Sequence, residues 1–140
     1  MIWKTFPSMQ HLNAIHENTA VAQLGIEFIE ATDDSITARM PVDERTKQPM
    51  GLLHGGASVL LAETLGSSAA NCCVDTSTHY CVGLDINANH IRATTGGWVK
   101  GTTKAIHIGR TTQVWEILIH DEAGKLTCIS RITMAVIPRK

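Results

Sequence analysis

The sequence predicts an α+β fold in which a curved antiparallel sheet surrounds one long helix. Residues 55–73 contain helix-forming Ala, Leu and Glu and no proline, over about five turns. From Tyr80 onward, apolar positions alternate with a period of two, which is typical of strands. A long apolar helix must be covered on nearly all sides, so a sheet curled around it is the economical arrangement.

The length and composition indicate one domain, residues 1–140, without repeats or linkers. Only 18% of the residues are charged, below the ~25% usual for soluble domains, so we expect another subunit to cover part of the surface. The formal net charge is -1 and only six residues are aromatic (three Trp, two Phe and one Tyr). This composition argues against nucleic acid as a partner.

The N-terminal segment is expected to form a lid or brace made of two short helical pieces. Ser8 is a suitable N-cap for a helix that carries Leu12 and Ile15. A shorter helical turn should begin after Thr19 and end at Gly25.

The remaining apolar runs are expected to be strands. Residues 26–31 and 36–42 flank the turn sequence Thr-Asp-Asp-Ser and therefore predict a hairpin. Four further strands are predicted after the helix, at residues 80–89, 98–107, 111–120 and 126–137. Residues 121–125 supply the last turn, and we expect these strands to form an antiparallel meander.

The chain is expected in the cytoplasm, because its N-terminus lacks the apolar core of a secretory signal. Its four cysteines lack zinc-site spacing and are expected to be reduced core thiols. Residues 51–74 are long and apolar enough to raise the question of a membrane span. They carry several polar residues, however, so a buried helix is the better interpretation.

Glu63 is the anomaly of the predicted helix. It follows Val59 and Leu60 by one turn and precedes Gly66 and Ser67 by one turn, in the least charged part of the chain. Burial of an unpaired carboxylate is costly, so such a glutamate is paired, neutralised or kept for chemistry that uses a raised pKa. The alternative is an ion pair or a solvent-exposed position, but no Lys or Arg lies three or four residues away.

His54, Gly55 and Gly56 stand where the helix begins. Backbone N–H groups at a helix start point outward with the positive end of the dipole and can polarise a carbonyl. An ordinary glycine-rich turn is the simpler alternative.

Gly55 and Glu63 cannot act on the same carbon within one chain, because eight helical residues separate them by roughly 12 Å. Two helices packed antiparallel about a two-fold axis near Val59 would bring each Gly55 beside the partner's glutamate, at a helix separation of ~8 to 10 Å. We therefore expect a homodimer with two shared active sites.

The sequence lacks the motifs of serine hydrolases, zincins and nucleotide-binding folds. The run from Gln48 to Ser58, followed by Glu63 and Ser67, resembles the hotdog-fold acyl-CoA thioesterases of the 4-hydroxybenzoyl-CoA thioesterase type. Further matching segments are residues 1–4, 40–43, 86–90 and 120–122, so the resemblance runs nearly end to end. It is closest to the branch that contains the 1,4-dihydroxy-2-naphthoyl-CoA thioesterase of menaquinone biosynthesis and the proofreading thioesterase of enterobactin synthesis.

The resemblance implies a five-stranded sheet on the helix. It assigns two strands to the early hairpin, and one core strand and a three-stranded meander to the four later segments. It also implies dimers joined into a homotetramer, with sites at the subunit interface. It assigns Glu63 as nucleophile or general base, and the Gly55 amide as the group that polarises the thioester carbonyl. Gln48, His54 and Ser67 would position the ester and water.

The resemblance also points to substrate-binding segments. Those for coenzyme A are Gly83, His90, Ile91, Arg92, Ala93, His107, Ile108, Gly109, Arg110, Thr111 and Thr112. Arg92 and Arg110 are the phosphate candidates, although without the resemblance both would be solvated charges at strand ends. The same solvated class is expected for His11, His16, His79 and His120.

Two departures from close relatives lie near the acyl group. Met50 replaces a common Phe, and Ser68 replaces an apolar residue. A flexible methionine is compatible with aryl or medium-chain acyl groups.

The sequence and this resemblance therefore predict an acyl-CoA thioesterase that releases free coenzyme A and an aromatic acid. It needs no metal and no cofactor beyond the coenzyme A of its substrate. Three alternatives stay open: a proofreading thioesterase for misacylated carrier protein, a hotdog hydratase or dehydratase, and a non-catalytic acyl-CoA-binding module.

Overall fold

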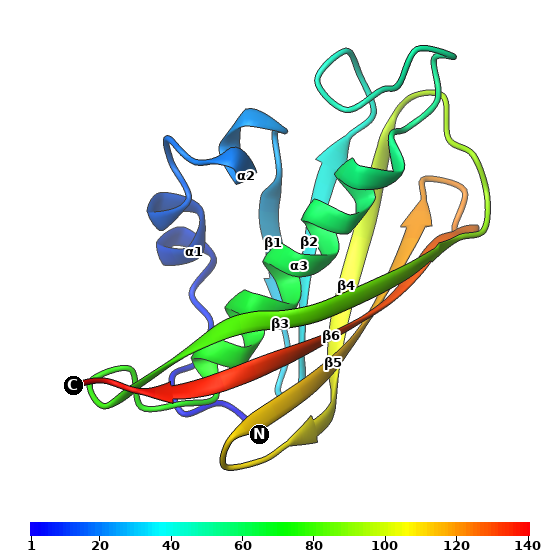
Figure 1. The fold of residues 1–140 in the computed structure, drawn as a ribbon. Coiled ribbons are helices and arrows are strands. Elements are labelled where there is room, and N and C mark those ends of the chain that lie inside the picture. The colour runs from blue at the N-terminus through cyan, green and yellow to red at the C-terminus, as the bar shows by residue number, and fades with distance from the viewer.

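The computed structural model describes residues 1–140 and contains three helices and six strands (Figure 1). The helices are α1 (Met9–Ile15), α2 (Ala20–Gln23) and α3 (Gly55–Cys72). The strands are β1 (Glu27–Ala31), β2 (Ser35–Pro41), β3 (His79–His90), β4 (Trp98–Ile108), β5 (Thr112–Asp121) and β6 (Leu126–Pro138). The predicted elements are all present, with boundaries that differ by one or two residues.

The six strands form one antiparallel sheet in the order β1-β2-β4-β5-β6-β3. Strand direction changes from steep at β1 and β2 to shallow at β6 and β3, so the sheet curls around α3 (Figure 1). α3 packs on β2 to β6, while α1 and α2 lie beside it near β1. The α+β prediction and the hotdog fold, a helix wrapped by a curved sheet, are confirmed.

Two details of the predicted sheet are corrected. The sheet has six strands rather than five, since both strands of the expected hairpin and all four later segments join it, with β2 paired to β4. The three-stranded meander is confirmed as β4, β5 and β6, but β3, the expected core strand, lies at the sheet edge beside β6. The chain therefore crosses from one edge, at the end of β3, to the interior strand β4.

The short helices begin at the residues that the sequence indicates. Ser8 caps α1 through its hydroxyl, which accepts a hydrogen bond from the His11 amide at 3.2 Å. Thr19 caps α2 in the same way, and the turn closes at Gly25, whose φ of 71° favours glycine. α1 and α2 form a brace along one side of α3.

α3 lies close to the sheet because its inward residues are small or tightly packed. Leu61 and Leu65 are completely buried, and Gly66 faces Ile132 of β6. A β-carbon on Gly66 would lie only 2.4 Å from Ile132 Cγ2, so only glycine fits at this helix–sheet distance.

The C-terminal end of α3 is held by a buried polar contact. The Trp115 indole donates to Gln113 Oε1 at 2.8 Å, and Gln113 Nε2 donates to the Ala70 carbonyl at 3.5 Å. Trp3 stacks on Trp115 with ring centroids 6.1 Å apart. The amides of Lys4 and of the next residue bond the Cys72 carbonyl, which ties the N-terminus to this helix end.

The side chains of β3 switch between the two faces of the sheet halfway along the strand. The alternation predicts one apolar face that includes Val82 and Leu84, but both side chains are exposed while Cys81 is buried. The β3–β6 register shifts between Gly83 and Asp85, so a bulge at Leu84 exchanges the inward and outward positions. The free edge of the sheet consequently displays apolar side chains.

No helix in the structure combines the length and the apolar character that crossing a bilayer requires.

We predict that Gly66→Ala lowers the free energy of unfolding by about 1–2 kcal/mol, because the added methyl group overpacks Ile132. Gly96→Ala is the matched control, since a β-carbon there meets nothing within 4 Å and its φ is not left-handed. That change should leave stability unchanged or raise it by a few tenths of a kcal/mol. Urea unfolding of both variants measures the difference, and equal stabilities would contradict the proposed close packing.

Candidate functional site

The start of α3 presents a free backbone donor. His54 is the N-cap, and its Nδ1 accepts the Gly56 amide at 2.8 Å. The amides of Ala57 and Ser58 both bond the His54 carbonyl. The Gly55 N–H alone in this turn has no acceptor, so it remains available at the positive end of an 18-residue helix.

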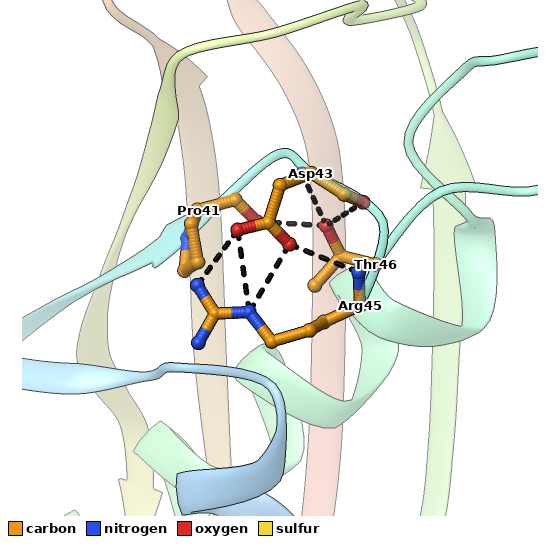
Figure 2. Close-up of polar contacts among 4 residues, drawn as sticks. All are labelled: Pro41, Asp43, Arg45 and Thr46. Atoms are coloured by element: carbon orange, nitrogen blue, oxygen red, sulfur yellow. Dashed lines mark hydrogen bonds and ion pairs between the residues drawn. The ribbon is translucent and has the colours of Figure 1, made fainter.

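The loop before α3 is held by a compact turn at residues 41–46 (Figure 2). The buried Thr46 donates from Oγ1 to the Pro41 carbonyl at 2.7 Å and accepts the Asp43 amide at 3.1 Å. Arg45 pairs with Asp43 at 2.7 Å and holds the pKa of that carboxyl below its usual value. The Thr46 carbonyl accepts the His54 amide at 2.8 Å, so this turn fixes where α3 begins.

A second tight turn carries the predicted positioning residue Gln48. Its amide bonds the Leu52 carbonyl at 2.8 Å, its side-chain Oε1 accepts the Met50 amide, and Gly51 adopts a φ of 80°. The Met50 side chain, at the tip of this turn, is 77% exposed. The methionine is therefore free to contact a bound molecule.

Gly55 lies against His90 from the end of β3. A β-carbon on Gly55 would stand 2.8 Å from His90 Nε2, so a side chain at this position would push the imidazole away. A cavity of about 310 Å³ opens here. Its lining includes the predicted residues Gln48, Gly55, His90, Ile91, Arg92 and Ala93. The structure thus brings together the helix start and one of the two predicted coenzyme A segments.

Glu63 is exposed in the single chain, contrary to the burial that its apolar neighbours predict. Leu61 and Leu65 are completely buried on the side of α3 that faces β4, whereas Glu63 lies at the margin of the sheet, over the edge strand β3. The carboxylate has no ion-pair partner, since the two ion pairs of the structure lie elsewhere. It lies over Gly83, where a β-carbon would stand 2.7 Å from Glu63 Oε2. Gly83, predicted to contact coenzyme A, therefore makes room for the carboxylate.

The Glu63 side chain lines a different cavity, which has a volume of about 480 Å³. Ser67 and Ser68 of the next helical turn line it, as does His16 from the segment after α1. Gly56 also lines this cavity, whereas Gly55 does not. The predicted residues are therefore divided between two cavities of one chain.

The division follows from helix geometry. Eight residues carry Glu63 roughly 12 Å along α3 and about 80° around its axis from Gly55. A carbonyl held by the Gly55 amide of one chain cannot also meet the glutamate of that chain.

The second predicted coenzyme A segment lies elsewhere. Ile108, Gly109 and Arg110 line a cavity of about 340 Å³ with Lys4 and His79, beside the C-terminal end of α3. The His107 ring lies over Gly109, and the carbonyls of Thr111 and Thr112 are used by backbone bonds to Val136 and Gly109. This segment and Arg92 are at opposite ends of a helix roughly 25 Å long.

The cysteines are thiols with raised pKa values. Burial raises the pKa of Cys72 to about 11 and that of Cys73 to about 12. Thiols with such pKa values hold little thiolate at neutral pH and are poor nucleophiles. The structure has no group of three or more His, Cys, Asp or Glu side chains arranged to hold a metal ion.

One residue that lines the Glu63 cavity was not predicted from the sequence. His16 was expected to be an ordinary solvated side chain, but it is half-buried, stacks on Phe28 and lines the Glu63 cavity. No local pattern could reveal this, because α1 and α3 are far apart in sequence and meet only through the packing of the brace.

Comparisons with known proteins agree on the family. Residues 50–128, more than half of the chain, match the Thioesterase superfamily. The chain is 50% identical over 137 residues to the 1,4-dihydroxy-2-naphthoyl-CoA hydrolase of Escherichia coli K12, covering 98% of this chain and 100% of that relative. A proofreading thioesterase of Cronobacter turicensis is also 50% identical, over 97% of this chain and 98% of its own length.

A solved structure supports the same assignment. The crystal structure of a mutant thioesterase from Pseudomonas aeruginosa superposes with a TM-score of 0.98 and 53% identity, over 99% of this chain and 100% of that one. The chain therefore belongs to the Thioesterase superfamily and is a thioester hydrolase with the hotdog fold.

Proposed function

We propose that the protein hydrolyses an aromatic acyl-CoA thioester, such as a hydroxynaphthoyl or hydroxybenzoyl ester, to the free acid and coenzyme A. The Gly55 N–H donates a hydrogen bond to the thioester carbonyl oxygen and stabilises the negative charge that develops there, and Glu63 supplies the carboxylate for the reaction. Acting as nucleophile, Glu63 attacks the carbonyl carbon and displaces the sulfur, and water then opens the acyl anhydride. Acting as base, Glu63 takes a proton from a water whose oxygen attacks that carbon, and the proton passes to the departing sulfur. In both routes the C–S bond breaks and the sulfur leaves as the thiol.

The observation that carries the proposal is the division of one catalytic set between two cavities. The free Gly55 amide lies beside one cavity at the start of α3 and the unpaired Glu63 carboxylate lies beside another about two turns later, so a productive site needs Glu63 of the partner subunit. Two antiparallel α3 helices that cross near Val59 supply this arrangement twice.

The edge of the sheet supports the same assembly. β3 is a 12-residue edge strand whose apolar Val82 and Leu84 are 41% and 62% exposed. A long apolar edge invites pairing with another strand. Pairing with β3 of a second copy would extend the sheet and bring the two Glu63-bearing faces together, and two such dimers would form the homotetramer.

Coenzyme A would enter past Gly55, where Arg92 is exposed and makes no ion pair. A guanidinium is well suited to bind phosphate oxygens with two donors. The Arg110 segment lies too far away to reach the same coenzyme in its own chain, so it would act from another subunit. The proposal places the reaction in the cytoplasm and uses no cofactor beyond the coenzyme A of the substrate.

We predict that Glu63→Gln lowers kcat/KM at least 100-fold, because the amide can neither attack nor accept a proton. Free-thiol release is measured with benzoyl-, hydroxynaphthoyl- and decanoyl-CoA for both proteins. A loss below about tenfold would remove Glu63 from the chemistry. If the protein hydrolyses the thioester of an acylated carrier protein but no CoA ester, coenzyme A is not the carrier of its acyl group.

Gly55→Pro should abolish the donor while keeping the helix, because proline lacks an N–H and is tolerated at the first helical position. His54 already has φ -67° and ψ 131°, which suits a residue before proline. Gly55→Ala is the control, since it adds the same β-carbon near His90 but keeps the N–H. We expect the proline variant to be about 100-fold or more below the alanine variant in kcat; equal rates would exclude the amide.

Mixed dimers test the shared site directly. When inactive Glu63→Gln and Gly55→Pro chains are refolded together in equal amounts, half of the dimers combine both chains, and each has one intact site. Activity should therefore return to about a quarter of the wild-type value. If each site used a single chain, mixing would restore nothing.

A further inference from the structure

His16 is held in one orientation between the brace and the sheet. It follows the last residue of α1, and its Nδ1 lies 2.6 Å from the Leu12 carbonyl. Its ring stacks on Phe28 of β1, with centroids 5.2 Å apart and an interplanar angle of 26°. These two contacts use one nitrogen and one face of the ring, which leaves the second nitrogen for another partner.

The bond to Leu12 determines the chemistry of that second nitrogen. A carbonyl oxygen only accepts hydrogen bonds, so Nδ1 must carry the proton that it shares with Leu12. In the neutral imidazole, Nε2 is then an acceptor. Nε2 makes no hydrogen bond within the protein.

His16 stands where two cavities meet. The cavity of about 480 Å³ contains Glu63, and a further cavity of about 300 Å³ continues between α1 and α3. His16, Ser67 and Ser68 line both of them. An acyl group whose carbonyl is at Glu63 would extend along these three side chains into the second cavity.

Few polar side chains line both cavities. Asn71 also lines the second cavity, but its amide is committed to the Ser67 carbonyl and to the backbone of Cys81. The hydroxyls of Ser67 and Ser68 make no hydrogen bond within the protein, and Ser68 is only 9% exposed. His16 thus supplies a fixed acceptor in a part of the cavity where two hydroxyls are also unpartnered.

We propose that His16 determines specificity by accepting a hydrogen bond from a hydroxyl substituent of the acyl group. This inference rests on the proposed function, and it adds the residue that distinguishes a hydroxylated acyl group from one without the hydroxyl. An acyl group without the hydroxyl leaves the half-buried Nε2 without a partner, and a site built to bond a hydroxyl discriminates against such analogues.

The test compares a matched pair of substrates, 1-hydroxy-2-naphthoyl-CoA and 2-naphthoyl-CoA, with wild type and two variants. His16→Phe keeps an aromatic ring on Phe28, and His16→Asn keeps a donor toward Leu12; both lack the far acceptor. We expect kcat/KM to fall about tenfold for the hydroxylated ester and less than about twofold for the plain ester. His120→Phe, which alters a histidine that lines neither the Glu63 cavity nor the second cavity, should leave the ratio of the two kcat/KM values unchanged.

Equal losses for the two esters would assign His16 a structural role and overturn the inference while the proposed function stands. An unchanged ratio of the two kcat/KM values in both His16 variants, or a ratio that falls in His120→Phe instead, overturns it as well. A wild-type protein that hydrolyses neither ester, and no other CoA thioester, overturns the proposed function and this inference with it. Melting temperatures of the variants confirm that each one is folded, and the two different substitutions guard against misfolding of either.

Discussion

The fold depends on the close packing of α3 against a curled sheet. The helix can approach the strands because Gly66 faces Ile132 and the small residues Ala62, Ala69 and Ala70 turn inward. This contact buries one side of a helix whose only charged residue is Glu63. The other side cannot be covered by the same sheet, and the glutamate and the glycine-rich start of α3 open there and at the helix end. The chemistry is therefore located where the packing stops.

Segments that are distant in sequence position the two functional groups of α3. Its N-terminal end is set by the turn at residues 41–46 and supplies a free amide beside His90. Its middle carries the carboxylate, for which Gly83 of β3 leaves space. Because Gly55 and Glu63 lie roughly 12 Å apart along the axis and about 80° apart around it, the same rigid helix that positions each of them keeps them from acting together in one chain. In the proposed function, the need for a second subunit is a consequence of placing both groups on one straight element.

Much of the fold was predictable because local signals were strong. Ser8 and Thr19 cap the short helices as expected, and the period-two runs became strands. The errors arose where distant packing decides. A bulge at Leu84 reversed the facing of β3, which alternation cannot anticipate, and Glu63 proved exposed because apolar neighbours along a helix do not reveal which side the sheet covers. The predicted site residues fell into groups whose separation only the three-dimensional structure could show.

The N-terminal brace has a role in the proposed function that differs from that of α3. The carboxylate and the amide belong to α3, whereas His16, after α1, forms a wall of the proposed acyl cavity beside Ser67 and Ser68. The brace is held on the core by the buried Leu12 and on β1 by Asn13, whose side chain bonds the β1 backbone twice. Substitutions at its cavity-facing positions would therefore reshape the acyl cavity while α3 keeps its packing on the sheet. In the proposed function, hydrolysis depends on α3 and its partner, whereas the choice of acyl group depends on a segment that β1 and the core hold in place.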